Sequence, residues 1–376
     1  MVEARPQWAS YTIRSVCRLM TNILALVTDA YGGRGGIAQY NRDFLTALAS
    51  AEAKVVVLPR HAPDAERPPN GVEQRPARFG RFAYSWSAIT EALRMKPDIV
   101  FCGHVFMAPL AWLAAKLARA KLVIQTHGID AWPRPSKFVR VACEQAAMIL
   151  SVSRYTRARV LDWAAMPPER VVVIPDTVSD RFTPGNGAAL RREWNLEGRK
   201  VLLTVGRMSA SERYKGHDRV IKALPDLIAA GIDIMYVIAG EGDDRPRLEQ
   251  LAHQVGVSDW VRFVGPLPLE TLIEAYRMAD LFVMPSTGEG FGIAFLEAMA
   301  CGTPALGLDV AGAHDALCDG ELGMAGDEQE FNSTLARMIV NVAPDPQKLA
   351  SAVRQRFGRE RFANAIRFAM LRLQEV

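Results

Sequence analysis

The segment 285–292 combines small residues with a carboxylate at a point where a ligand could bind. It follows the apolar run Leu281–Met284 and leads into a helical pattern at 291–299. Glu289 is therefore predicted at a helix N-terminus, where free backbone amides favour a sugar hydroxyl or a phosphate oxygen. The amides beside it belong to Gly290, Phe291 and Gly292.

A second carboxylate lies on the same predicted helix. Glu297 follows Glu289 by eight residues, about two helical turns. Its neighbours Leu296 and Ala298 are apolar, and a carboxylate in such surroundings costs free energy unless it has a polar partner. Two ribose hydroxyls of a nucleotide would be such a partner. The alternative is that Glu289 is a helix-terminal charge and Glu297 faces solvent.

Two cations follow the apolar run 201–205. Arg207 comes directly after Gly206, and Lys215 stands eight residues later. Together they could bind a diphosphate, the arginine as a bidentate donor and the lysine as a point charge. The alternative is that both form surface ion pairs, as exposed basic residues often do.

The N-terminal half offers two further loops. The glycine-rich stretch 32–36 follows the apolar run 23–28, and Gly35 and Gly36 would let the backbone approach a phosphate at a helix N-terminus. His127 ends the run 122–126, where it could donate a hydrogen bond to a substrate, and Asp130 follows closely. The alternatives are a flexible turn and a structural or solvated histidine.

The pattern between these loops predicts an α/β fold with two doubly wound units. Continuous apolar runs alternate with amphipathic stretches, which is typical of parallel sheets covered on both faces. Strands are predicted at 23–28, 55–58, 99–102, 122–126, 148–152 and 171–174, and again at 201–205, 235–239, 261–264, 281–284 and 304–307. A polar stretch at 175–187 separates the two sets. The predicted divisions are an N-terminal extension at 1–19, domains at 20–185 and 186–350, and a C-terminal helix from 351 to 376.

Composition limits the class of protein. The chain has 376 residues, which favours two domains. Its five cysteines form no paired framework, which favours a reduced, cytoplasmic setting. No apolar run reaches membrane-spanning length and no signal peptide is evident. Residues 20–180 contain 20 Lys and Arg against 14 Asp and Glu, an excess that could attract an anionic surface.

Taken together, these residues resemble the GT4 family of retaining glycosyltransferases. The segment from Glu289 to Glu297 matches the family signature E-x-F-G-x-x-x-x-E. Gly206-Arg207, Lys215-Gly216, the His127-Gly128 step, the glycine-rich loop and the turn 300–304 match further family elements in the same order. The resemblance implies the GT-B fold, in which two Rossmann-like domains face a central cleft. It also implies that the C-terminal domain binds the nucleotide sugar, that the N-terminal domain binds the acceptor, and that the C-terminal helix crosses back to the N-terminal domain. The resemblance covers nearly the whole chain.

The resemblance also implies roles for these residues. Arg207 and Lys215 would neutralise the leaving diphosphate, and Glu297 would bind the ribose. Glu289 and the amides after it would hold the transferred sugar. His127 would face the reacting sugar, with Asp130 on the acceptor side. The donor-binding set implied is Gly35, Gly36, Gly206, Gly290, Phe291, Gly292 and Glu297.

A metal ion and other cofactors are not expected, because the chain has no D-x-D triplet of the kind that binds metal in GT-A enzymes. Two departures from the family pattern are the long segment between Arg207 and Lys215 and the Pro175-Asp176-Thr177 stretch where many relatives have Asn-Gly. Two rival classes of protein share this fold pattern. A nicotinamide-dependent oxidoreductase would need a GxGxxG loop, which does not occur, and a non-catalytic nucleotide-sugar-binding subunit would be expected to have lost signature residues.

The expected partners are a nucleotide-diphosphate sugar and a saccharide or lipid-linked saccharide acceptor. GDP-mannose is the predicted donor, with UDP-sugars next, in the synthesis of a surface polysaccharide or glycolipid. No nucleic acid is expected. A peripheral position on the inner face of the plasma membrane is a further hypothesis, based on aromatic and basic residues that could lie at an interface: Trp86, Trp112, Phe138, Arg81, Arg134, Lys137 and Arg140.

Overall fold

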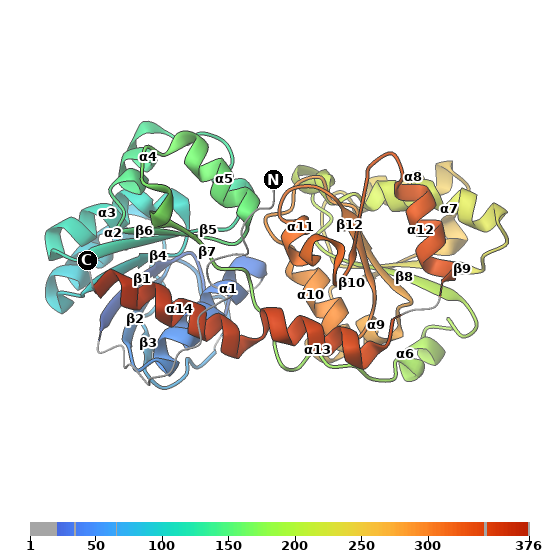
Figure 1. Ribbon diagram of the computed structural model, residues 1–376, viewed down its shortest axis with the longest axis horizontal. Coiled ribbons are helices and arrows are strands. Elements are labelled where there is room, and N and C mark those ends of the chain that lie inside the picture. The colour runs from blue at the N-terminus through green and yellow to red at the C-terminus, as the bar shows by residue number, and fades with distance from the viewer. Residues whose placement is uncertain (1–20, 34, 65, 342–343, 375–376) are drawn as a thin grey trace. The chain divides into compact units, whose positions relative to one another are not determined.

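The computed structural model describes residues 21–33, 35–64, 66–341 and 344–374 (Figure 1). The extension expected at residues 1–19 lies outside these ranges. The chain forms two compact units. Unit 1 comprises the residues up to Ser151, Arg157–Ile174 and those from Glu360 onward, and unit 2 comprises Val152–Thr156 and Pro175–Arg359.

Unit 1 is built on a seven-stranded sheet in which every paired strand is parallel, in the order β3-β2-β1-β4-β5-β6-β7. The inner strands are buried on both faces, which explains their continuous apolar sequences. The strands are β1 (Asn22–Val27), β2 (Lys54–Pro59), β3 (Val72–Gln74), β4 (Ile99–Cys102), β5 (Lys121–Thr126), β6 (Met148–Ser151) and β7 (Val171–Val173).

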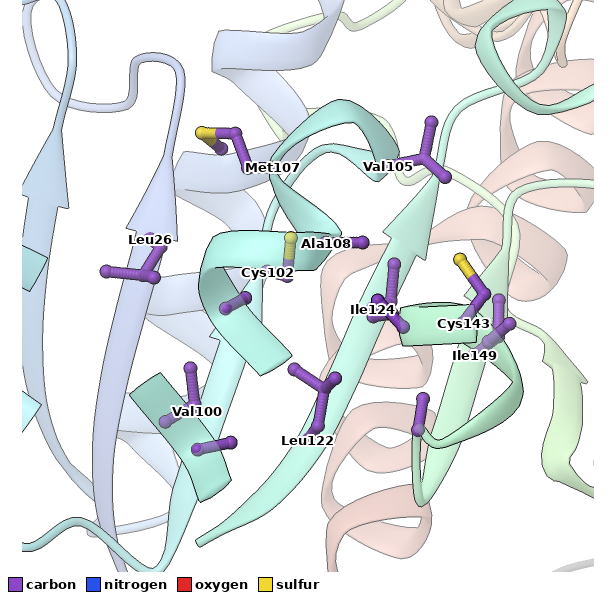
Figure 2. Packing of buried hydrophobic residues seen from close by; sticks show 14 of the residues in the cluster. Leu26, Val100, Cys102, Val105, Met107, Ala108, Leu122, Ile124, Cys143 and Ile149 are labelled. Carbon is purple, nitrogen blue, oxygen red and sulfur yellow. The ribbon is translucent and has the colours of Figure 1, made fainter. Parts of the chain in front are cut away.

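Helices cover both faces of this sheet. One face packs against small residues of α2, α3 and α4, and Figure 2 shows this core with Cys102 and Ile124 of the sheet beside Ala108 and Cys143 of the helices. On the other face, Phe44 of α1 stacks on Phe101 with ring centroids 4.1 Å apart. The helices are α1 (Gly36–Ser50), α2 (Arg81–Met95), η2 (Val105–Met107), α3 (Ala108–Ala118), η3 (Ile129–Ala131), α4 (Lys137–Glu144), α5 (Arg154–Trp163), η4 (Pro168–Arg170) and α14 (Arg359–Gln374).

Unit 2 repeats this architecture with a six-stranded parallel sheet in the order β10-β9-β8-β11-β12-β13. Its strands are β8 (Lys200–Val205), β9 (Ile234–Ala239), β10 (Val261–Gly265), β11 (Leu281–Met284), β12 (Ala305–Leu308) and β13 (Met324–Gly326). Its helices are α6 (Ala188–Glu193), η5 (Ala210–Lys215), α7 (His217–Ala229), α8 (Arg245–Gln254), η6 (Ser258–Trp260), α9 (Leu269–Met278), α10 (Ile293–Ala300), α11 (Ala313–Ala316), η7 (Cys318–Gly320), α12 (Phe331–Val340) and α13 (Pro346–Phe357).

The prediction of one continuous C-terminal helix is wrong, because the chain forms two helices there. α13 ends at Phe357, and Gly358 adopts an extended conformation before α14 begins. The carbonyl of Phe357 accepts hydrogen bonds from the amide of Val178 and the hydroxyl of Thr177 instead of continuing a helix. α13 belongs to unit 2, and α14 from Glu360 onward belongs to unit 1. The chain therefore changes unit at this break.

Candidate active site

The segment after β11 forms a tight loop around Glu289. α10 begins at Ile293 and not at Phe291, so the amides of the preceding glycines come before its first turn. Gly292 caps the helix with φ 100°, and a Cβ atom there would lie 2.7 Å from the ring of Phe295. Only glycine fits this conformation without strain. The amide of Gly312 donates to the carbonyl of Glu289 at 2.8 Å, which fixes the loop against the segment after β12.

Phe291 contributes to this loop through its backbone alone. Its side chain is buried and packs edge-on against Phe357, with ring centroids 5.6 Å apart. The aromatic ring of the signature therefore belongs to the core of unit 2. Any contact of Phe291 with a ligand must come from its amide.

Lys215 and Glu289 lie together at the carboxyl ends of the neighbouring strands β8 and β11. The lysine Nζ is 3.4 Å from Glu289 Oε2, and the two side chains are only 14% and 16% exposed. The amide of Thr287 donates to the carbonyl of Tyr214 at 2.8 Å and joins the two loops. Gly216 has φ 78° and packs so tightly on the Pro285 carbonyl that a Cβ atom would lie 2.3 Å from its oxygen.

The long segment before Lys215 folds into the short helix η5. The hydroxyl of Ser209 accepts a hydrogen bond from the amide of Ser211 and starts this helix. The extra residues are thus taken up in a turn, and Lys215 still reaches Glu289. The departure from the family pattern noted in this segment therefore does not separate Lys215 from Glu289.

Arg207 lies beside the same loop but is directed toward solvent. Its side chain is 75% exposed and forms an ion pair with Glu212 of η5. Oε2 of Glu212 is buried without a hydrogen-bond partner among the described residues. The stem of Lys215 passes beside Gly206, where a Cβ atom would lie in ordinary van der Waals contact with the lysine Cδ, at 3.5 Å. The ion pair with Glu212 therefore positions Arg207, while its guanidinium stays accessible to a ligand from solvent.

Glu297 has a protein partner that sequence reasoning missed. The hydroxyl of Tyr276, on α9, donates to Glu297 Oε2 at 2.7 Å. Burial raises the pKa of Tyr276 well above its usual range, so the phenol stays a hydrogen-bond donor. The tyrosine orients the carboxylate on the otherwise apolar helix α10. A tyrosine within an amphipathic helix gives no sequence signal of this role.

In unit 1, His127 follows β5 as predicted, and its ring is neutral. Nε2 lies 2.9 Å from the carbonyl oxygen of Gly103, which can only accept, so Nε2 carries the proton. Burial lowers the pKa of His127 to about 4. The ring also packs edge-on against Tyr40 at 5.2 Å. His127 can therefore offer Nδ1 as an acceptor near neutral pH, but not a second N–H donor.

Asp130 supports the backbone of this loop and not the histidine ring. Its carboxylate accepts a hydrogen bond from the amide of His127 at 3.1 Å. Burial raises the pKa of Asp130 to about 7, so its charge is sensitive to pH near neutrality.

The glycine-rich loop of unit 1 leads into α1 as predicted. Gly35 caps the helix with φ 89°, and Gly36 is its first residue. A Cβ atom at Gly35 would meet nothing within 4 Å, so the backbone conformation is what requires glycine there. Arg42 donates to the carbonyls of Ala30 and Gly33 at 2.9 and 2.7 Å and braces the loop.

The structure thus groups the candidate residues by unit. Arg207, Lys215, Glu289 and Glu297 lie at the carboxyl end of the unit 2 sheet or on the helix that follows it, whereas Gly35, Gly36, His127 and Asp130 lie at the carboxyl end of the unit 1 sheet. Ligands of doubly wound folds bind at such ends. No cluster of three or more metal-ligating side chains occurs among the described residues. None of the helices within the described ranges has the length and hydropathy of a membrane span.

His217, which sequence reasoning did not single out, is buried at the start of α7 beside this site. Its Nε2 has no hydrogen-bond partner in the described ranges, and burial lowers its pKa to about 4. In the unfolded chain a histidine titrates near pH 6.5. The stability that the neutral ring contributes is therefore fully present above about pH 6.5 and is lost as the pH falls toward 4.

We expect the unfolding free energy to fall between pH 7 and pH 5, with His217 contributing about 2 kcal/mol of the decrease. Denaturant titrations of wild type and His217→Gln at both pH values measure this. The exposed His253 provides the control, His253→Gln, which should leave the pH dependence as in the wild type. Equal slopes for wild type and His217→Gln would contradict the assignment.

Comparison with known proteins agrees with this geometry. The model of the glycosyl transferases group 1 matches residues 188–356, and that of glycosyltransferase family 4 matches residues 34–181. The two matches cover the two units almost separately. The fold is a two-domain α/β architecture of the GT-B type.

Relatives with named activities align with this chain over most of their length. A GDP-mannose-dependent alpha-(1-6)-phosphatidylinositol monomannoside mannosyltransferase of Mycolicibacterium smegmatis is 30% identical, with 88% of this chain and 91% of that protein aligned. A D-inositol 3-phosphate glycosyltransferase of Geodermatophilus obscurus is 29% identical over 85% of this chain and 80% of its own. The chain therefore belongs to the GT4 family of glycosyltransferases.

Solved structures show the same fold at lower sequence identity. Anabaena HepE in complex with UDP and glucose superposes with a TM-score of 0.75 at 20% identity, covering 93% of this chain and 99% of HepE. WaaG, a glycosyltransferase of lipopolysaccharide biosynthesis, gives a TM-score of 0.65 at 21% identity, covering 91% and 99% of the two chains. Both likenesses support the GT-B fold class.

Proposed function

We propose that this glycosyltransferase is a retaining hexosyltransferase that takes its sugar from a nucleotide diphosphate donor and needs no metal ion. The observation that carries the proposal is the pairing of Lys215 with Glu289 at the ends of β8 and β11. A cation for the leaving diphosphate and a carboxylate for the sugar hydroxyls are thereby held at one point. Fixed charges of this kind stabilise charge that develops in a transition state.

In the proposed reaction the bond between the anomeric carbon and the phosphate oxygen breaks, and its electron pair stays on the diphosphate. Lys215 and Arg207 neutralise the charge that develops there. The acceptor hydroxyl forms the new bond on the same face of the sugar, and its proton passes to a phosphate oxygen of the leaving group. No enzyme nucleophile is needed. Neutral His127 would accept a hydrogen bond from a sugar hydroxyl through Nδ1.

The relatives support a choice of substrates. The mycobacterial relative is GDP-mannose-dependent and acts on a phosphatidylinositol monomannoside, while HepE binds UDP-glucose. We propose GDP-mannose as donor, with UDP-sugars as the second candidate, and a lipid-linked or free saccharide as acceptor. The product would belong to a surface polysaccharide or glycolipid, made in the cytoplasm at the inner face of the plasma membrane.

Two rival classes differ from this proposal. Glycosyltransferase models match both halves of the chain, which favours sugar transfer over nicotinamide chemistry. A non-catalytic nucleotide-sugar-binding subunit could keep the pair of Lys215 and Glu289 for binding alone, so turnover of the donor is what separates it from an enzyme. Such a subunit would bind the nucleotide sugar without ever consuming it.

The donor can be identified by thermal denaturation with a panel of nucleotide sugars, since a ligand of the folded state raises its stability.

With the donor found, we expect turnover to be unchanged by EDTA, because fixed cations and not a metal neutralise the diphosphate. Nuclear magnetic resonance of the product should show the anomeric configuration of the donor. Loss of activity in EDTA that Mg²⁺ restores, or an inverted product, would contradict the mechanism.

A further inference from the structure

Three neighbouring helices of unit 1 expose large apolar side chains to solvent. α2, α3 and α4 pack side by side on one face of the sheet (Figure 1). On α2, Phe82 is 93% and Trp86 74% exposed, whereas Tyr84 and Ala88 of the same helix are buried. On α4, Phe138 is 80% exposed. These side chains form an outward face that the sheet does not cover.

The most exposed aromatic residues gather at one edge of the sheet. In a parallel sheet each helix starts where the preceding strand ends, so the first turns of α2 and α4 lie at the carboxyl edge. Phe106 of η2, which follows β4 directly and is 68% exposed, lies at the same edge. η2 contacts both α3 and α4. We call this set the aromatic rim, and its members are Phe79, Phe82, Trp86, Phe106 and Phe138.

Exposed basic residues accompany the rim. Arg78 and Arg81 flank Phe79 at the start of α2, and Arg134 and Lys137 precede Phe138. Between residues 75 and 145 the chain has 11 Lys and Arg against 4 Asp and Glu. Two of those acids already form ion pairs within the unit. Glu91 pairs with Arg75 and Arg94, and Glu144 pairs with Arg140. The free charge beside the rim is therefore positive.

The structure changes the membrane hypothesis drawn from the sequence. Trp112 is partly buried against the core, with Lys116 Nζ 5.1 Å from its ring centroid, and so is not part of the exposed face. Arg140 forms an ion pair with Glu144, so its charge is partly neutralised within the unit. Phe82, with almost its whole side chain in solvent, was not anticipated and is the most exposed member of the rim.

The rim is continuous with the acceptor side of the site in unit 1. The ring of Phe106 stacks on His104 at 4.9 Å, and His104 lies 6.0 Å from the ring of His127. An acceptor sugar held near His127 would thus lie close to whatever the rim contacts. This link to a lipid-carried acceptor rests on the proposed function, whereas the surface itself does not.

We propose that the aromatic rim and its basic neighbours bind the surface of a bilayer containing anionic lipids. Large aromatic side chains next to Arg and Lys are suited to the boundary between headgroups and acyl chains. Basic residues near such a surface are attracted by its negative potential.

The test is flotation of the full chain with vesicles of phosphatidylcholine, either pure or with about a third phosphatidylglycerol. Wild type should bind the anionic vesicles much more tightly than the neutral ones. Phe82→Ser/Trp86→Ser should weaken that binding at least tenfold, since burial of each aromatic side chain is lost. Arg81→Gln/Lys137→Gln should weaken it about tenfold or more. Both pairs are exposed, so the fold should be unaffected.

Matched controls lie in unit 2. Val340 is an exposed apolar residue and Lys222 an exposed cation, so Val340→Ser and Lys222→Gln should bind vesicles as wild type does. Unchanged binding by Phe82→Ser/Trp86→Ser, or equal binding to both kinds of vesicle, would overturn the proposal. A dimer in light scattering that this double variant abolishes would assign the rim to a second copy instead. Thermal stabilisation by the donor measures binding at the site in unit 2, independently of vesicle binding. Failure of the membrane proposal can therefore be told apart from failure of the proposed function.

Discussion

Replacing Lys215 with alanine is expected to lower kcat about a hundredfold while the protein remains folded. Loss of a fixed group that stabilises developing charge costs catalysis on this scale. Lys215 is 14% exposed and held by the loop that joins Tyr214 to Thr287, so its ammonium is positioned before the donor binds. The measurement is steady-state turnover of the donor, beside Lys222→Ala as the control on an exposed cation of α7.

The ion pair with Glu289 requires a second comparison. Lys215→Ala leaves a poorly exposed carboxylate without its cation, which could impair the loop by itself. Lys215→Ala/Glu289→Gln removes that charge. If Lys215 neutralises the diphosphate, the double variant stays inactive, and Glu289→Gln alone loses at least tenfold through the sugar contacts. Recovery of turnover in the double variant would show that the lysine only balances Glu289.

The pairing of Lys215 with Glu289 illustrates what the sequence could and could not predict. Each residue was identified from its position after an apolar strand and from the family signature. Their contact depends on β8 and β11 being neighbours, although β9 and β10 lie between them in the chain. Strand order follows from how the crossover helices pack, and local pattern does not encode it. The contact therefore emerged only in three dimensions.

Other elements were missed for local reasons. β3 and β13 have three residues each and contain Glu73, Gln74 or glycine, so neither forms an apolar run. The break at Gly358 interrupts a helical period that continues on both sides, and the cause is the capture of the Phe357 carbonyl by Thr177, far away in the sequence. Tyr276 could not be predicted as a site residue, because its hydrogen bond to Glu297 depends on α9 lying beside α10.

Replacing Glu297 with glutamine is expected to raise KM for the donor between about tenfold and a hundredfold with little change in kcat. Hydrogen bonds to a charged group contribute roughly 1.5–3 kcal/mol. If Glu297 binds the ribose, as we propose, this contact is the same in the ground and transition states and affects KM alone. Tyr276→Phe is the matched variant. It removes only the hydroxyl that orients the carboxylate at 2.7 Å, so its effect on KM should be smaller and in the same direction.

Binding of the nucleoside diphosphate alone distinguishes Glu297 from Glu289. The ribose is present in the diphosphate but the transferred sugar is not, so Glu297→Gln should weaken binding of the diphosphate as much as that of the nucleotide sugar. Glu289→Gln should weaken only the nucleotide sugar. Isothermal titration of both ligands with both variants measures this. A 2′,3′-dideoxy diphosphate should bind wild type and Glu297→Gln equally, because the hydroxyls that Glu297 would hold are gone. If the dideoxy ligand still preferred the wild type, the carboxylate would act on the fold of α10 and not on the ribose.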